Sequence, residues 1–300
     1  MKFNFQYDHI YMKPLLIFYG NCQCVSLTKI LRLKYHYHIK CIDCYKTEWD
    51  ENKFLRFIKR AHLIIMTFIH ENYRNKNYLS TKFILENCGP KPKIIILPSM
   101  YFDFYYLDTF HIKTNNKNQI QDTLIEPTPY HYKHMIKCYK KKKSVEHYIT
   151  NYVTNPNLYT HTELENKAQQ SINKLKEREN YIETHQTIHK FNCVHISDYI
   201  KDNYKDKLLF NTFNHPSNYL LQYVAESIYD ILKLNKIHID YQASPLDFVK
   251  CILYESVQKH VNFNIKQHEP SHHKIRGLYK VCQSYHDIFR KPENRKYLID

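Results

Sequence analysis

Glycine is scarce in this chain. Only Gly20, Gly89 and Gly277 occur among 300 residues. Glycine most easily takes positive φ or lets the backbone approach a ligand closely, so the place of each one is informative. The motifs G-x-x-x-x-G-K-[ST], G-x-G-x-x-G, H-E-x-x-H and G-x-S-x-G are all absent. The function classes that these motifs define are therefore not indicated.

Long apolar runs and paired cysteine spacings are missing as well. No run approaches the roughly 18 residues of a membrane span. Residues 14–19 are too short for a signal-peptide core and lead straight into a turn. The nine cysteines are scattered and odd in number, which indicates a reducing compartment. We expect a soluble, cytoplasmic protein without a membrane span; the oligomeric state is open.

The formal net charge of +15 has two interpretations. One is an anionic partner such as nucleic acid, a membrane or a phosphorylated ligand. The other is a solvated surface enriched in lysine by A/T-rich codons. Four consecutive lysines, residues 140–143, either hold a phosphate-rich ligand or form a loop. Because no known nucleic-acid module is present, nucleic acid is the less favoured partner.

The first hundred residues alternate apolar runs with amphipathic stretches. Buried strands are predicted at residues 15–19, 37–42, 62–68 and 94–97. Helices are predicted at residues 22–34, 54–60 and 78–87. This alternation is typical of βαβ units. We therefore expect an α/β fold with a mostly parallel sheet of about four to six strands flanked by helices.

The later part of the chain is expected to be mainly helical. A polar helix is predicted over residues 162–181, and an apolar stripe predicts another that starts at Pro216 and runs to residue 232. Short strands are expected at residues 194–196 and 208–210, and helices at 246–257 and 278–289. We divide the chain into an α/β domain, residues 1–235, and a helical C-terminal extension, residues 236–300, packed on it.

The first candidate site is Gly20-Asn21-Cys22-Gln23, between the first predicted strand and helix. In open parallel sheets, ligands bind at the carboxyl ends of strands. A helix N-terminus there offers free N–H groups to a phosphate or oxyanion. Cys22, in the first turn, is expected to have a lowered pKa and to be reactive. The alternative is a small buried cysteine beside a glycine that merely makes the turn.

The second candidate site is Asn214-His215-Pro216. Proline is favoured at the first helical position, so His215 is expected at or beside an N-cap, exposed at a strand-to-helix turn. The positive end of the helix dipole disfavours an imidazolium, and a neutral imidazole can act as a general base. The alternative is a capping or core histidine.

Weaker candidates lie elsewhere. His36, His38, Cys41 and Cys44 have the side chains of a zinc site. In a strand, however, Cys41 and Cys44 point to opposite faces, so no metal is expected.

Three further candidate residues lie near the ends of other predicted helices and strands. Arg178, followed by Glu179 near the end of the polar helix, either grips a phosphate or is a surface charge. Thr67 and Ser99 lie at the ends of predicted strands, on the edge where ligands bind.

The pairing of these motifs resembles the WcbI-type capsular polysaccharide biosynthesis proteins. That family begins with a strand running into G-N-C-Q and later carries a short strand followed by N-H-P and an apolar helix. Between them it has a helix that ends in Arg-Glu, here Arg178-Glu179. The resemblance spans about residues 13–235. Residues 140–143 and the last sixty residues have no match, and the family's glycine and proline in the loop after residue 98 are missing here.

The resemblance implies a coenzyme A-dependent acetyltransferase that acts on a carbohydrate or nucleotide-sugar hydroxyl. His215 would be its general base, with Cys22 a nucleophile or a scaffold residue. Coenzyme A, or acetyl-CoA, would be held by Gly20, Asn21, Gln23, Arg178 and Asn214. Two alternatives stay open. One is an esterase or deacetylase with a Cys22–His215 dyad, by analogy with the G-D-S block of SGNH esterases. The other is a non-catalytic, basic nucleic-acid-binding protein.

Overall fold

The computed structural model describes residues 13–45, 50–111, 130–184, 190–235, 245–247, 249–263, 271–272 and 275–292. Their contacts divide the chain into two compact units. The first unit comprises Met1–Pro98, Asn180–Val194 and Ser227–Ile237, and the second comprises Ser99–Glu179, His195–Glu226 and His238–Asp300. The predicted division at residue 235 stays a prediction, and part of the proposed extension lies outside the described residues.

The first unit contains a five-stranded, wholly parallel sheet in the order β2-β1-β3-β4-β7. Its strands are β1 (Leu15–Gly20), β2 (His38–Asp43), β3 (Leu63–Thr67), β4 (Lys93–Leu97) and β7 (Asn192–Cys193). Its helices are α1 (Cys22–Ile30), α2 (Glu51–Arg60) and α3 (Thr81–Asn87), with 3₁₀ turns at Leu33–Tyr35, Tyr73–Asn75 and Asn77–Leu79. The predicted α/β class and strand number are confirmed.

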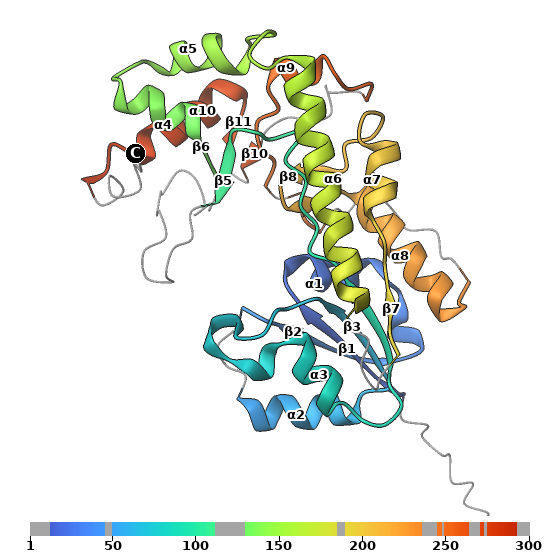
Figure 1. Ribbon diagram of the computed structural model, residues 1–300. Coiled ribbons are helices and arrows are strands. Elements are labelled where there is room, and N and C mark those ends of the chain that lie inside the picture. The colour runs from blue at the N-terminus through green and yellow to red at the C-terminus, as the bar shows by residue number, and fades with distance from the viewer. Residues whose placement is uncertain are drawn as a thin grey trace, which may run out of the picture. The chain divides into compact units, whose positions relative to one another are not determined.

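Both faces of this sheet are covered. α1 lies on one side of the sheet, and α2 and α3 lie on the other (Figure 1). The core on the α2–α3 side includes Ile17, Ile64 and Ile94 from successive strands, with Phe54 and Ile58 from α2. The central strands are buried at every position after the first residue of β1 and of β4, as expected for a doubly covered parallel sheet.

Among its described residues, the second unit contains helices and short antiparallel strand pairs. These pairs join β5 (Thr109–His111) with β6 (Tyr130–Tyr132), β8 (Phe210–Thr212) with β9 (His215–Pro216), and β10 (Ser271–His272) with β11 (Ile275–Arg276). Its helices are α4 (Lys133–Lys140), α5 (Val145–Tyr148), α7 (Ser197–Asn203), α9 (Glu255–Gln258) and α10 (Leu278–Ile288), with a π-helical turn at Ile149–Val153. α6 (His161–Thr184) and α8 (Asn218–Leu232) begin in this unit and end in the first.

Tyrosine and phenylalanine rings fill the core of the second unit. Phe102 contacts the rings of Tyr105, Tyr204 and Phe210 at centroid distances of 5.4 to 5.8 Å. The buried Tyr105 hydroxyl donates to the backbone oxygens of Tyr204 and Lys207, at 2.6 and 2.9 Å. A buried phenol needs such a partner, so the many tyrosines tie separate segments together.

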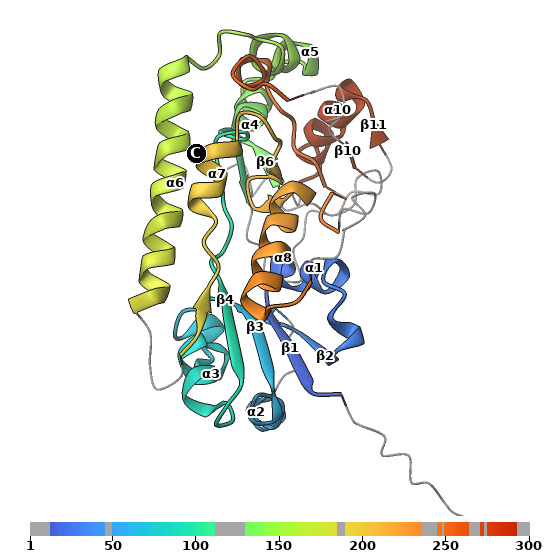
Figure 2. The ribbon, with the colours of Figure 1, turned by 90° about the vertical axis from the view of Figure 1, so that its right-hand side faces the viewer.

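Several predictions about elements need correction. The second short strand predicted near residue 208 exists as β8, but it pairs antiparallel with β9 and is not part of the parallel sheet. The prediction of a helix over residues 246–257 is wrong for most of its described residues, since α9 begins only at Glu255 and ends at Gln258. The predicted helices at residues 162–181 and 278–289 are confirmed as α6 and α10. α6 runs beside α7 in both views (Figure 2).

Candidate functional site

The loop after β1 lies where the sheet topology changes direction. The chain passes from β1 to β2 on one side and then returns to β3 on the other side of β1. β1 ends at Gly20 and β3 ends at Thr67, and the Thr67 hydroxyl lies 3.3 Å from Asn21 Oδ1. A topological switch point of this kind is where open parallel sheets bind ligands. Gly20 to Gln23 therefore occupy the expected position for a binding loop.

Gly20 is required here by its conformation and by Thr67. Its φ is +150°, and a Cβ at this position would lie 2.6 Å from Thr67 Oγ1. Such a contact is far inside van der Waals distance, and an L-residue rarely takes this φ. Glycine lets β1 and β3 stay paired while the chain turns into α1.

Asn21 accepts hydrogen bonds from several backbone N–H groups of this loop. It is the N-cap of α1, and its Oδ1 accepts from the backbone N–H groups of Gln23 at 3.1 Å and Cys24 at 3.4 Å. Its backbone oxygen accepts from Val25 N at 3.0 Å. The free N–H groups expected for a phosphate or oxyanion are thus largely satisfied within the chain. Among Asn21, Cys22 and Gln23, only Cys22 is partly exposed.

Cys22 is the first residue of α1 and is half-buried. Burial raises the pKa of its thiol to about 11, and the nearby Gln23 N–H offsets only part of this. The expectation of a lowered pKa is therefore wrong, because loss of solvation outweighs the helix N-terminus. At pH 7 the side chain is a neutral thiol, which is a poor nucleophile.

Asn214 and His215 lie in the β8–β9 hairpin of the second unit. Asn214 Oδ1 accepts from the Tyr130 hydroxyl at 2.6 Å and from the Thr212 hydroxyl at 3.0 Å. The backbone N–H of His215 donates to Thr212 Oγ1 at 3.0 Å. The Tyr130 ring meets the His215 imidazole edge-on, with centroids 5.5 Å apart. These contacts hold both side chains in one arrangement.

The predicted placement of His215 at an exposed helix start is wrong. His215-Pro216 forms β9, and α8 begins two residues later at Asn218. His215 is only 6% exposed. The turn chemistry of the hairpin, with Thr212 bonding back to the chain, prevailed over the preference of proline for the first helical position.

Arg178 and His215 are linked by a row of aromatic rings within the second unit. The Arg178 guanidinium lies over the Tyr101 ring at 5.2 Å, and its Nη1 donates to Ser99 O at 3.3 Å. Tyr101 stacks on Phe213 at 6.2 Å, and Phe213 meets Tyr130 at 5.6 Å. Tyr130 in turn contacts His215. The structure thus joins Arg178 and the Asn214-His215 pair in one group.

Sequence reasoning did not identify Tyr101, Phe213 and Tyr130. Phe213 directly precedes the Asn214-His215-Pro216 motif and Tyr101 follows the fourth strand, so both positions adjoin segments that had been considered. In a chain with 28 tyrosines and 16 phenylalanines, however, composition could not single them out. No local pattern points to the tertiary contacts that align them.

Glu179, next to Arg178, has a structural role. It is 1% exposed, and its carboxylate accepts from Ile196 N at 2.6 Å, Ser197 N at 2.9 Å and Ser197 Oγ at 2.6 Å. α7 has no side-chain cap from its own N-cap residue. Glu179 therefore caps α7 from α6, and this fixes the end of α6 that carries Arg178.

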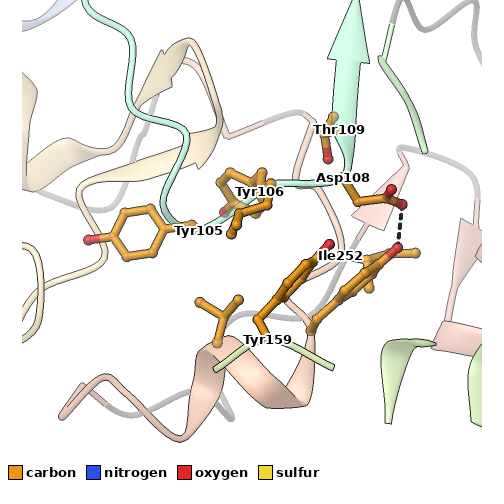
Figure 3. Close-up of a pocket in the computed structure, with 9 residues that line it drawn as sticks. Tyr105, Tyr106, Asp108, Thr109, Tyr159 and Ile252 are labelled. Atoms are coloured by element: carbon orange, nitrogen blue, oxygen red, sulfur yellow. Dashed lines mark hydrogen bonds between the residues drawn. The ribbon is translucent and has the colours of Figure 1, made fainter. Parts of the chain in front are cut away.

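A second buried carboxylate, Asp108, joins separate segments of the second unit. It accepts from the Tyr254 hydroxyl at 2.6 Å and from His134 N at 3.0 Å, and His134 Nδ1 lies 2.7 Å from Asp108 Oδ1. The small pocket beside it is lined by nine residues, four of which are tyrosines (Figure 3). The free space is too narrow to hold a water molecule, so it is a packing gap.

The remaining sequence candidates show no site. Cys41 is exposed, whereas Cys44 is buried. Within the described ranges, no three His, Cys, Asp or Glu side chains gather in a way that could hold a metal ion. The lysines at residues 140–143 end α4 and enter an exposed turn, where Lys142 takes a φ of +53°. Among the described residues, no helix has the length and apolar character needed to cross a membrane.

Comparison with known proteins places the chain in a family. The model of the polysaccharide biosynthesis enzyme WcbI matches residues 15–236, so the chain belongs to the WcbI family of polysaccharide biosynthesis enzymes. A solved structure of WcbI shares the fold, with a TM-score of 0.72 and 19% sequence identity over 94% of this chain and 91% of that one. That structure is described as the native protein without a disulfide bond between coenzyme A and one of its cysteines. No curated protein matches significantly.

Proposed function

We propose that this protein transfers an acyl group, acetyl in the first instance, from coenzyme A to a hydroxyl of a carbohydrate or nucleotide-sugar acceptor. Family membership supports a role in polysaccharide biosynthesis. The observation that carries the cofactor assignment is Cys22, a partly accessible thiol on a switch-point loop. The similar WcbI structure, described by the absence of a disulfide between coenzyme A and a cysteine, supports a thiol close to the cofactor sulfur.

The residues of the loop suit the thiol end of coenzyme A better than its phosphates. Asn21 already engages two backbone N–H groups, whereas the Cys22 thiol is neutral and half-buried. Bound as a thioester, coenzyme A would supply the activated acyl group. Cys22 then lines the position of the thioester, and its high pKa keeps it from taking the acyl group itself. We assign it a scaffold role.

His215 is our candidate for the general base. It would take the proton from the acceptor hydroxyl as the oxygen attacks the acyl carbon, and return that proton to the departing thiolate. Thr212 holds its backbone and Tyr130 holds its ring, so the imidazole has little freedom to turn away.

The two alternatives are less well supported. A Cys22–His215 esterase needs a thiolate, and burial raises the Cys22 pKa to about 11. A nucleic-acid-binding role would use the positive charge, but the family is one of polysaccharide biosynthesis enzymes.

The test is a calorimetric titration with coenzyme A, followed by an acetyl-CoA transfer assay that monitors free thiol. We expect coenzyme A to bind, and His215→Ala to lower turnover by roughly 10²- to 10⁴-fold with unchanged coenzyme A affinity. His215→Asn is the matched variant, since Asn forms hydrogen bonds but takes no proton at pH 7. Absence of binding at millimolar coenzyme A refutes the cofactor, and full turnover of the Asn variant refutes the base.

A further inference from the structure

Tyr101 and Phe213 form a partly exposed aromatic platform between a cation and a histidine. Their rings are 6.2 Å apart and nearly parallel, at 27°. Both are half-buried, as are Arg178 and Asn214. Tyr130, which contacts Phe213, is 3% exposed, and His215, which contacts Tyr130, is 6% exposed. Buried groups therefore adjoin rings that are partly exposed.

The platform is held rigidly. Phe102 N donates to Phe213 O at 2.8 Å, which ties the segment of Tyr101 to the β8–β9 hairpin. Tyr130 contacts the Phe213 ring edge-on and bonds Asn214 through its hydroxyl. Glu179 anchors the helix end that carries Arg178. A ligand that binds here meets a surface formed in advance, which reduces the entropy lost on binding.

Arg178 has charge to offer to a ligand. Its contacts are the Tyr101 ring and the Ser99 carbonyl, and no carboxylate of the described residues pairs with it. The neighbouring Glu179 carboxylate is engaged by Ile196 and Ser197. A guanidinium is suited to bidentate binding of a phosphate or carboxylate.

The order of groups matches one kind of ligand. Aromatic faces are electron-rich and attract the polarised C–H bonds of a sugar ring. Asn214 and His215 follow Phe213 in the chain, and both contact Tyr130, whose ring also meets that of Phe213. A pyranose ring lying on Tyr101 and Phe213 would direct an anionic substituent to Arg178 and a hydroxyl toward Asn214 and His215.

We infer that Tyr101, Phe213 and Arg178 form the acceptor subsite, and that its ligand is a sugar carrying a phosphate or other anionic group. This inference rests on the proposed function for the identity of the reaction, but not for the binding itself. It assigns Arg178 to the acceptor and not to the phosphates of coenzyme A. The same cation and rings also suit the phosphorylated adenosine of coenzyme A, so the experiment must separate the two sources.

The probes are glucose 1-phosphate, mannose 1-phosphate and galactose 1-phosphate, with free glucose and inorganic phosphate as references, and their binding is measured by titration calorimetry. At least one sugar phosphate should bind more tightly than either reference. Tyr101→Leu, Phe213→Leu and Arg178→Gln should each weaken it about fivefold to tenfold. Tyr101→Phe, which keeps the aromatic ring, should bind the sugar phosphate as tightly as the wild type does. The matched control is Tyr219→Leu, at a tyrosine that is 49% exposed on α8.

Coenzyme A is titrated in parallel by calorimetry, and thermal melting checks each variant for folding. If Phe213→Leu fails to fold, the comparison of Tyr101→Leu with Tyr101→Phe decides. Binding of none of the three sugar phosphates overturns the inference, as does an equal loss in Tyr219→Leu. Loss of coenzyme A affinity in Arg178→Gln and Tyr101→Leu also overturns it and assigns the platform to the cofactor. If wild type binds a sugar phosphate but no coenzyme A, the acceptor subsite stands and the proposed function fails.

Discussion

Glu179 should be among the most stabilising polar residues of the second unit. In Glu179→Ala, the N–H groups of Ile196 and Ser197 and the Ser197 hydroxyl lose their acceptor. A buried donor left without a partner costs about 1–3 kcal/mol. Three such donors, with partial relief by water entering the gap, give an expected loss of about 4 kcal/mol. Glu179→Gln keeps an acceptor oxygen for the backbone donors and should cost only about 1 kcal/mol.

The assay is urea unfolding followed by far-UV circular dichroism and by tyrosine fluorescence. Two probes are needed because a chain of two compact units need not unfold in one transition. Hydrogen exchange at Ile196 and Ser197 gives a local readout of the cap. The control is Glu177→Ala, an exposed neighbour on the same helix. If Glu179→Ala loses no more than Glu177→Ala, the carboxylate does not cap α7 and the reasoning is refuted.

Three further outcomes follow from the geometry. Alkylation of Cys22, followed by mass spectrometry of its peptide, should accelerate steadily up to pH 9.5 without a plateau, because its pKa is about 11; a plateau near neutral pH would show a reactive thiolate. Gly20→Ala should destabilise the protein by about 2 kcal/mol in urea unfolding, through the clash with Thr67 and its φ of +150°; an unchanged midpoint would contradict that packing. Burial, and then the charge of Arg290, lower the pKa of His286. On acidification, the unfolded chain therefore protonates His286 at a higher pH than the folded protein does. The stability that the neutral imidazole contributes is present above about pH 6.5 and is lost as the pH falls. His286→Gln should flatten that decline, and an identical acid limb in both proteins would count against it.

The parallel sheet could be predicted because its signals are local. The strands near residues 15, 62 and 94 are short apolar runs, and the helices between them follow a 3.6-residue pattern. The prediction failed where a short strand pairs outside the parallel sheet. β8 looks like another buried strand in sequence, yet its partner is β9, only a few residues later. The described residues before α9 are apolar and buried without being helical, and their apolar spacing resembles that of a buried helix.

For the candidate site residues too, the predictions that depend on local sequence succeeded and those that depend on tertiary packing failed. The Gly20 to Gln23 loop was placed correctly at the end of a central strand, since strand and helix signals meet there. The environment of Cys22 was not foreseen, because its pKa depends on how many atoms of other segments surround it. The roles proposed for His215, Arg178 and the loop stay predictions.

By itself, the amino-acid sequence determined the alternation of strands and helices, the glycine turn after β1, and the family to which the chain belongs. Each depends on residues adjacent in the chain or on a motif of a few letters. The tertiary structure alone decided that Cys22 is a neutral thiol, that Glu179 is a cap, and that Arg178, Tyr101, Phe213, Tyr130 and His215 form one row. Burial and side-chain contact are properties of the packed chain, and packing joins residues that sequence separation keeps far apart.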